Sequence, residues 1–176
     1  MKDVVIRNVE ERDATQYITL ANHVWRVAYK DIFPEEVFAD MEARKDDRIA
    51  RFSQKYYTDD ERVTCVAEID SKIVGIASGG KLSLCEYFAE KNYADLVSLY
   101  VHPDYQGIGI ATALKKHFEM WAKEHGATKY VIGVMKENKK ARTVYEKWGG
   151  ELSQYEAPFM RLGKGYDEVF YTYNLD

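Results

Sequence analysis

The stretch DLVSLYVHPDYQGIGIATA, residues 95–113, decides how this chain folds. Its first part, residues 96–101, is an apolar run typical of a buried strand. A short polar turn follows, and Gly107 and Gly109 then lead into the start of a helix. A strand that passes through glycines into a helix directs unpaired backbone N–H groups, and the positive end of the helix dipole, at one point. The stretch therefore predicts an anion site, best suited to a phosphate or pyrophosphate.

The elements after this stretch complete a βαβ unit. Helical spacing places Leu114, Phe118 and Trp121 on one face of a helix, and Gly126 is a good C-terminal stop. Residues 130–135 are nearly continuously apolar, as expected of a strand covered on both faces. Because a strand, a helix and a strand follow one another closely, we expect the two strands to be parallel neighbours.

The rest of the chain predicts an α/β fold with a mixed, mostly antiparallel sheet. Asp13 and Gln16 have the spacing of a capping box that opens a helix. The segment 82–92 is a loop or a short helix at the mouth of a site. The other expected elements are strands at 4–9, 64–69, 73–78, 151–155 and 169–175, helices at about 14–29, 34–41, 46–57 and 139–148, a hairpin turn at 70–72 and a loop at 156–167.

Composition indicates one globular domain over residues 1–176. Of the 176 residues, 46% are apolar and 14% are aromatic, which is enough for a substantial core. No apolar run approaches the roughly 20 residues of a membrane span, and the N-terminus lacks the apolar segment of a signal peptide. We therefore expect a cytoplasmic protein that does not bind membranes.

Charge and residue usage argue against several functional classes. The net charge is −4 and no basic face is evident, so we predict no nucleic-acid partner. Cys65 and Cys85 form neither a C-x-x-C pair nor a disulfide framework. The four histidines lie in no cluster at ligand spacing, so we predict no metal site. An acidic balance suits a cationic amine substrate, although mild acidity is also ordinary in soluble proteins.

Two familiar nucleotide-binding motifs fit the glycine region poorly. A dinucleotide fingerprint needs G-x-G-x-x-G/A, but its last position is Thr112, and no acidic residue ends the next strand. A nicotinamide-dependent oxidoreductase therefore fails on the fingerprint. A Walker A loop needs a terminal Gly-Lys-Ser/Thr, which is absent. What remains is Gln106-x-x-Gly109-x-Ala111 directly after a strand.

This pattern resembles the signature Q/R-x-x-G-x-G/A of the GCN5-related N-acetyltransferase (GNAT) family. The preceding run 99–103 looks like the family's usual strand end, and Asn138-x-x-Ala141-x-x-x-Tyr145 is similar to its second cofactor motif. The resemblance covers residues 95–150 well and the N-terminal half only through element order. It implies the single-domain acyl-CoA N-acyltransferase fold, in which the central parallel strands splay apart at the cofactor site.

The resemblance also implies a binding mode for acetyl-coenzyme A. The backbone of Leu99, Tyr100 and Val101 would pair with the pantetheine arm, and Asn138 and Ala141 belong to the second cofactor motif. The alternatives are that the glycines only make a tight turn and that Asn138 is only a helix N-cap. The pyrophosphate would lie on the segment Gln106, Gly107, Ile108, Gly109, Ile110, Ala111 and Thr112.

The chemistry that the resemblance implies needs an acid and a base. Tyr145 would be the general acid that protonates the departing thiolate, since phenol and thiol pKa values are close; the alternative is a core tyrosine on the apolar stripe. A primary ammonium is mostly protonated at neutral pH, so direct attack needs a base or a proton wire. Asp95 or Glu86 could serve, although each could equally be an ordinary surface or turn carboxylate.

The acceptor side is less determined by sequence. Trp25, Tyr29 and Phe33 lie on the first helices, which cover the acceptor site in similar enzymes, and could bind a cation by cation–π contact or pack in the core. We expect an acetyltransferase acting on a primary amine of a polyamine, an amino acid or an amino sugar. A protein N-terminus or lysine acceptor, and a non-catalytic acyl-CoA-binding module, remain open. A homodimer is plausible from the aromatic content.

Overall fold

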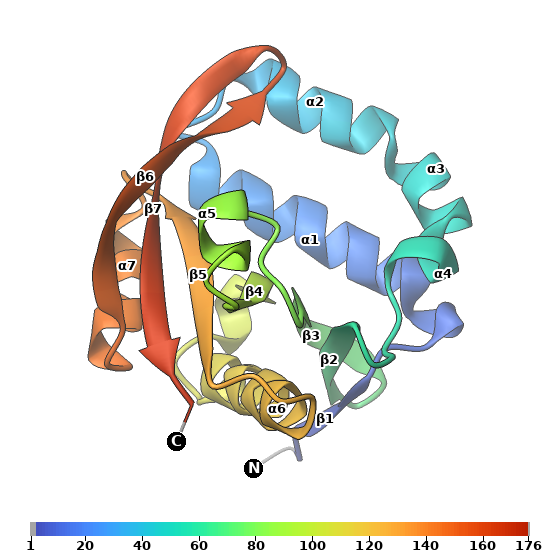
Figure 1. The fold of residues 1–176 in the computed structure, drawn as a ribbon. Helices are drawn as coiled ribbons and strands as arrows, with labels where there is room; N and C mark the ends of the chain where they lie inside the picture. The colour runs from blue at the N-terminus through green and yellow to red at the C-terminus, as the bar shows by residue number, and fades with distance from the viewer. Residues whose placement is uncertain (1–2, 176) are drawn as a thin grey trace.

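One mixed sheet forms the centre of the computed structural model, which describes residues 3–175 (Figure 1). Within that range the sheet has seven strands in the order β1-β2-β3-β4-β5-β7-β6. Only β4 and β5 pair in parallel, which confirms the predicted α/β class. The strands are β1 Val5–Asn8, β2 Arg62–Ile69, β3 Lys72–Gly80, β4 Ala94–Val101, β5 Lys129–Met135, β6 Glu151–Arg161 and β7 Lys164–Asn174.

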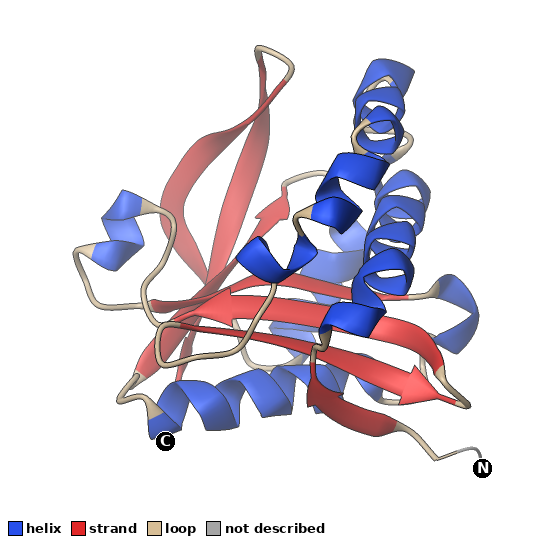
Figure 2. Cartoon of the chain, turned by 90° about the vertical axis from the view of Figure 1, so that its right-hand side faces the viewer, coloured by secondary structure: helices blue, strands red, loops and turns tan. Residues whose placement is uncertain are grey.

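Helices cover both faces of this sheet (Figure 2). Successive strand side chains point to opposite faces, so Ala67 of β2 packs against the α6 side while its neighbour Val66 packs against α1. Leu114 and Phe118 of α6 are fully buried on their face, and Tyr17 and Ile18 of α1 fill the other. The helices are α1 Ala14–Tyr29, α2 Glu35–Ala43, α3 Lys45–Ala50, α4 Phe52–Lys55, α5 Glu86–Ala89, α6 Ile110–Glu124 and α7 Lys139–Lys147.

The predicted capping box at the start of α1 is wrong. Asp13 makes no cap hydrogen bond to α1; instead it closes a box with Glu10 around a short 3-10 turn. Its carboxylate accepts hydrogen bonds from Arg7 at 2.7 and 2.9 Å, an ion pair that lies half-buried between β1 and the helix. Gln16 reaches the β2–β3 hairpin, where it accepts a hydrogen bond from Ile73 N. Tertiary partners have replaced the local ones that the spacing suggested.

The loop expected at 156–167 is also wrong. These residues extend β6 and β7 into a long hairpin whose turn holds Leu162 and Gly163 with φ of 46° and 78°. Two consecutive positive φ values are typical of the tight turns that join antiparallel strands. Phe159 and Tyr166 then pack with Phe33, so the hairpin reaches over to the α1–α2 side (Figure 1). Pro158 lies within β6, a position where proline is uncommon except on edge strands, and β6 is the edge strand of this sheet.

A bulge in β4 separates the two parallel strands. Against β3, Ser78 pairs with Ser98 and Gly80 pairs with Asp95, so β4 uses one more residue than its partner. Strand β4 pairs with β5 only at Ala94 and Asp95, although β5 continues alongside β7. The predicted splaying of the central parallel pair is therefore confirmed. Gly79 is required beside the bulge because a Cβ there would lie 2.5 Å from the Asp95 carbonyl oxygen.

Two further observations concern membrane-spanning helices and metal-binding groups. Among residues 3–175, no helix has the length and apolar character needed to cross a bilayer. The same residues contain no group of three or more His, Cys, Asp or Glu side chains placed to hold a metal ion.

Candidate active site

The loop between β4 and α6 forms an open cradle of backbone N–H groups. Gly107 and Gly109 have φ of +79° and +90°, a backbone conformation that favours glycine. A Cβ added at either would meet nothing within 4 Å, so the space in front of the loop is open. Within the described chain, the N–H groups of residues 107–112 donate no hydrogen bond to any protein acceptor. Behind them stands α6, a helix of 15 residues, whose dipole favours an anion here.

Gln106 fixes the position of this loop. Its Nε2 donates to the Val101 carbonyl at 3.0 Å, and its Oε1 accepts a hydrogen bond from Lys140 Nζ at 2.7 Å. The side chain thus ties the cradle to the end of β4 on one side and to α7 on the other. Its amide is used within the protein, which gives Gln106 a positioning role in addition to its place in the motif.

The three predicted β4 residues lie where the strand has lost its parallel neighbour. Leu99, Tyr100 and Val101 pair with β3, and within the described residues no strand pairs with their other edge. Leu99 and Val101 pack into the core on the α6 side. Tyr100 points to the opposite face, where its hydroxyl accepts a hydrogen bond from Trp25 Nε1 at 2.8 Å. An extended chain of amide groups could add to the free edge as a further strand does.

The gap left where β4 separates from β5 is called the opening here. Helix α7 brings the second motif to this opening. Asn138 Oδ1 accepts a hydrogen bond from Ala141 N at 3.2 Å, so the N-cap interpretation holds, and the Asn138 side chain also lies at the Tyr29 hydroxyl. Tyr145 is 8% exposed and packs against Trp148 and Tyr171. Burial, with smaller contributions from nearby tyrosines that include Tyr29, raises its pKa well above the ordinary value. Its hydroxyl therefore stays protonated at neutral pH, and the raised pKa lies further above that of a thiol than an ordinary phenol does.

The two carboxylates predicted as bases have different surroundings. Asp95 is buried, and its Oδ2 accepts hydrogen bonds from Ser83 Oγ at 2.8 Å and from Leu84 N at 3.0 Å. These bonds fasten the 82–92 segment to β4, and burial raises the pKa of Asp95. Glu86 is exposed in the first turn of α5. The geometry gives Asp95 an anchoring role, and a catalytic role for Glu86 stays a prediction.

Sequence reasoning missed Glu168, which lies on β7 beside the opening. It pairs with Met135 of β5, and its Oε1 would lie 2.5 Å from a Cβ at Gly133. It is partly buried, and burial, with a smaller contribution from the charge of Asp95, raises its pKa to about 7. Glu168 also interacts electrostatically with Tyr29. Alternation along β7 could have placed it on this face, but the sequence predicted a loop up to residue 167.

The three aromatic residues predicted for the acceptor side are brought together. Trp25 stacks on Phe33 with ring centroids 5.4 Å apart, and Tyr29 meets both rings edge-on. Trp25 and Phe33 are buried, and with Tyr166 they hold the β6–β7 hairpin against α1 and α2. Core packing, the alternative kept open by the sequence, is therefore present. Of the three, Trp25 also lines a cavity.

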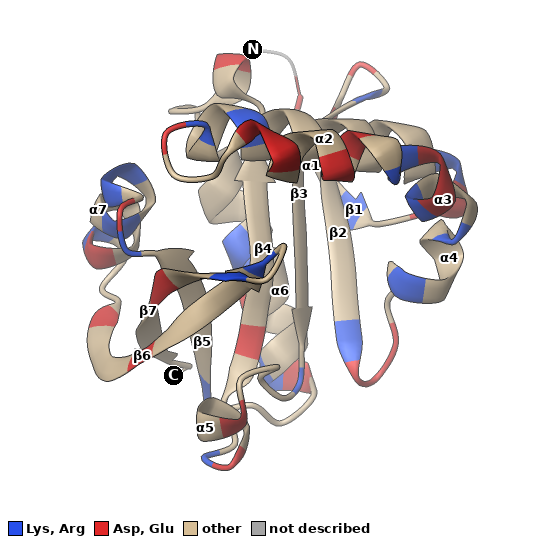
Figure 3. Cartoon of the chain, turned by 90° about the horizontal axis from the view of Figure 1, so that it is seen from above, with Lys and Arg blue, Asp and Glu red and all other residues tan. Residues whose placement is uncertain are grey.

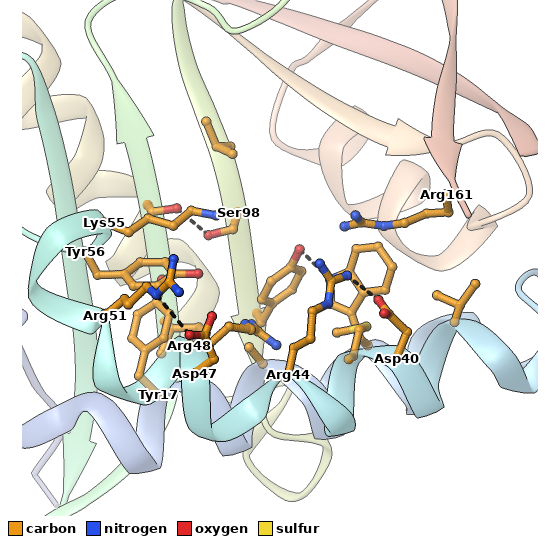
Figure 4. Close-up of a pocket in the computed structure, with 18 of the residues that line it drawn as sticks. Tyr17, Asp40, Arg44, Asp47, Arg48, Arg51, Lys55, Tyr56, Ser98 and Arg161 are labelled. Atoms are coloured by element: carbon orange, nitrogen blue, oxygen red, sulfur yellow. Dashed lines mark hydrogen bonds and ion pairs between the residues drawn. The ribbon is translucent and has the colours of Figure 1, made fainter. Parts of the chain in front are cut away.

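That cavity has a volume of about 680 Å³ and lies on the α1 face of the sheet (Figure 4). Its floor includes Ser98 and Tyr100 of β4, and its walls come from α1 to α4 and from the tip of the β6–β7 hairpin. The Ser78 and Ser98 hydroxyl oxygens are 2.7 Å apart, and the buried Tyr17 hydroxyl interacts with both. The volume suits a small molecule, and the floor is the strand that borders the opening.

The cradle, the splayed strands and the motif on α7 all lie within a segment that matches a known protein family. A family model described as the acetyltransferase (GNAT) family matches residues 22–150. The chain belongs to the GNAT family. A Mycobacterium bovis protein named as an uncharacterized N-acetyltransferase is 30% identical over 122 residues, which cover 69% of this chain and 72% of that protein.

Solved GNAT structures share the fold along nearly the whole chain. The PaiA N-acetyltransferase of Thermoplasma acidophilum, in complex with coenzyme A, has a TM-score of 0.70 at 20% identity and covers 94% of this chain and 98% of its own. The yncA protein of Salmonella typhimurium, with its cofactor acetyl-CoA, has a TM-score of 0.66 at 22% identity, with 98% and 94% covered. Both confirm the fold that the sequence implied.

Proposed function

We propose that this GNAT protein transfers the acetyl group of acetyl-CoA to a primary amine of a small molecule by direct attack. The observation that carries the proposal is that strand β4, at the β4–β5 opening, lies between two different sites, the N–H cradle and the cavity. The N–H cradle follows β4 on the cofactor side, and residues 97, 98 and 100 of the same strand line the cavity on the α1 face. An anion-binding loop and a cavity on either side of one strand suit a reaction that needs both ligands bound together.

The residues present fit acetyl-CoA. Six unpaired N–H groups and an open space in front of two glycines suit a pyrophosphate, and the free edge of residues 99–101 suits the amide-bearing arm. Lys139 and Lys140 are exposed at the start of α7, beside the cradle, where a further phosphate could meet them. When bound there, the cofactor supplies an activated thioester to the opening.

Tyr145 is proposed as the general acid. Its hydroxyl is buried near other tyrosines, and burial together with those tyrosines raises its pKa. It keeps its proton at neutral pH and can give it to the sulfur as the bond between carbonyl carbon and sulfur breaks. Asn138, which holds the start of α7 and contacts the Tyr29 hydroxyl, keeps this part of the site in place.

Glu168 is proposed as the base in place of Asp95. It lies on the acceptor face, next to the free end of β5. As a carboxylate it accepts one proton from the incoming ammonium, directly or through water, and the amine nitrogen then attacks the carbonyl carbon. The second proton, which the nitrogen loses on becoming an amide, restores the Tyr145 hydroxyl after that hydroxyl has protonated the sulfur. A base with a pKa near the operating pH is ionised often enough to accept a proton and basic enough to hold it.

The competing function is a GNAT domain that binds acyl-CoA without catalysis. Calorimetry with coenzyme A tests the feature common to both, and we expect micromolar binding. A thiol-release assay with acetyl-CoA and a panel of small amines then separates them. We expect an amine-dependent release of coenzyme A with equal formation of acetylated amine. Binding without amine-dependent release would favour the sensor, and release only with peptides would favour a protein acceptor.

A further inference from the structure

The acceptor cavity is cationic although the chain as a whole is acidic. Its lining carries five cationic side chains and two carboxylates, an excess of three positive charges in a chain whose net charge is −4. Lys and Arg occur together with Asp on α3, and a Lys lies on the neighbouring α4, at one side of the sheet (Figure 3). The cations are Arg44, Arg48, Arg51, Lys55 and Arg161, and the carboxylates are Asp40 and Asp47.

Internal ion pairs use only some of these cations. Arg44 pairs with Asp40, and Arg51 pairs with Asp47 at 2.9 Å. Arg48 is held by a neutral partner, because its Nη1 donates to the side-chain oxygen of Asn22 at 2.6 Å. Within residues 3–175, three lining cations have no carboxylate at ion-pair distance: Arg48, Lys55 and Arg161.

Arg161 is the most unusual of the three. It comes from the tip of the hairpin and points into the cavity opposite Arg44 and Asp40 (Figure 4). Its guanidinium lies 5.1 Å from the Trp25 ring centre and 4.8 Å from that of Phe159. Its Nε is buried and, among the described residues, has no hydrogen-bond partner. Burial lowers its pKa, so an anion that restores its hydrogen bonds would relieve that cost.

We propose that the acceptor amine carries an anionic group, a carboxylate or a phosphate, which this cavity binds through Arg161 and Arg48. The inference rests on the proposed acetyl transfer and narrows its substrate. A planar guanidinium packed against two aromatic rings presents a fixed pair of N–H donors, which matches the two oxygens of either anion. With the anion held there, the amine end points to the β4 floor. Polyamines, one of the three expected acceptor kinds, bring only positive charge and are disfavoured.

Matched amines test the proposal in the presence of saturating coenzyme A. One arm compares amino acids with their amides, and a second compares a hexosamine phosphate with the unphosphorylated sugar; spermidine is the cationic member. Calorimetric Kd and, with acetyl-CoA, kcat/KM are measured for wild type, Arg161→Gln, Arg161→Lys and Arg48→Gln. Arg12→Gln is the control because Arg12 is exposed and pairs with Glu10, outside the cavity lining.

We expect at least one anionic amine to bind about tenfold or more tightly than its neutral counterpart, as a charge-assisted hydrogen bond allows. Arg161→Gln should abolish the preference for the anionic amine over its neutral counterpart, and Arg161→Lys should keep part of that preference. Coenzyme A binding should not change in either variant. Equal or stronger binding of neutral amines or spermidine, an unchanged ratio in both glutamine variants, or no binding of any anionic amine would overturn the inference. Acetylation of neutral amines alone would overturn it while leaving acetyl transfer intact; binding without transfer would overturn only the proposed activity.

Discussion

The two sides of the β4–β5 opening are built in different ways. The cofactor side, residues 94–150, is one continuous stretch of the chain, a βαβ segment followed by a helix. The acceptor side is assembled from α1 to α4, from β3 and β4, and from the tip of a distant hairpin. The cofactor side offers unpaired backbone N–H groups, whereas the proposed acceptor side offers charged side chains. A shared cofactor can be held by main chain, while an individual acceptor must be selected by side chains.

The cofactor side should be the more sensitive to a change in backbone geometry. Replacing Gly109, whose φ is +90°, by valine strains the loop and fills the space in front of the N–H groups. We expect coenzyme A binding to be lost in calorimetry. Gly126→Val is the matched control, since Gly126 has φ of +84° and equally open space at the far end of α6. If both variants are destabilised to a similar degree and only Gly109→Val loses coenzyme A binding, the result supports the cradle as the cofactor site. Coenzyme A binding by Gly109→Val would contradict it.

On the acceptor side, the largest effect on turnover is expected at Glu168. Glu168→Gln should lower kcat by about 10³-fold, because a general base contributes roughly that much. Asp95→Asn can keep both hydrogen bonds to Oδ2 and should cost about tenfold or less. Wild-type kcat/KM should fall as the pH drops below about 7. If Asp95→Asn proves the more damaging change, the base has been assigned to the wrong carboxylate.

Tyr145 should affect chemistry without affecting cofactor affinity. Tyr145→Phe should reduce kcat by about 10²-fold, since it removes a proton donor and keeps the packing. Tyr130→Phe is the control: Tyr130 is fully buried, and its hydroxyl donates to Glu119 within the core. Calorimetry should give the same coenzyme A affinity for all three proteins. Equal turnover of Tyr145→Phe and wild type would leave Tyr145 as a core tyrosine.

The smallest expected effect is on stability. The pKa of Glu168 is raised to about 7 in the folded protein, so its ionisation opposes folding. Stability is therefore lost as the pH rises from the ordinary glutamate value through about 7. Glu168→Gln should raise Tm relative to wild type at pH values above 7 and leave it unchanged near pH 4, where both side chains are neutral. An equal increase in Tm above pH 7 and near pH 4 would show that the effect is not due to ionisation of Glu168.

The contrast between a site formed by one continuous segment and a site assembled from distant segments explains what the sequence could predict. The order of elements, the parallel pair, the glycine cradle and the helix of Asn138 and Tyr145 all follow from local patterns. Arg161 could not be predicted, because it acquires its surroundings only when the hairpin folds over α1 and α2. Glu168 acquires its neighbours only when β7 pairs with β5. The mildly acidic composition suggested a cationic acceptor. In the cavity lining, however, positively charged side chains outnumber negatively charged ones, although the whole chain has the opposite balance. Net charge describes the whole surface and does not report on one site.

Direct transfer between the two sides is the central claim, and initial-velocity kinetics test it most directly. Rates are measured over a grid of acetyl-CoA and acceptor concentrations, and mass spectrometry is used to look for acetylated enzyme without acceptor. If both ligands must occupy their own sides of the opening together, double-reciprocal lines intersect and no acetylated enzyme forms. Parallel lines with a covalent acetyl-enzyme would contradict the account, because the acetyl group would then wait on the protein between two separate steps.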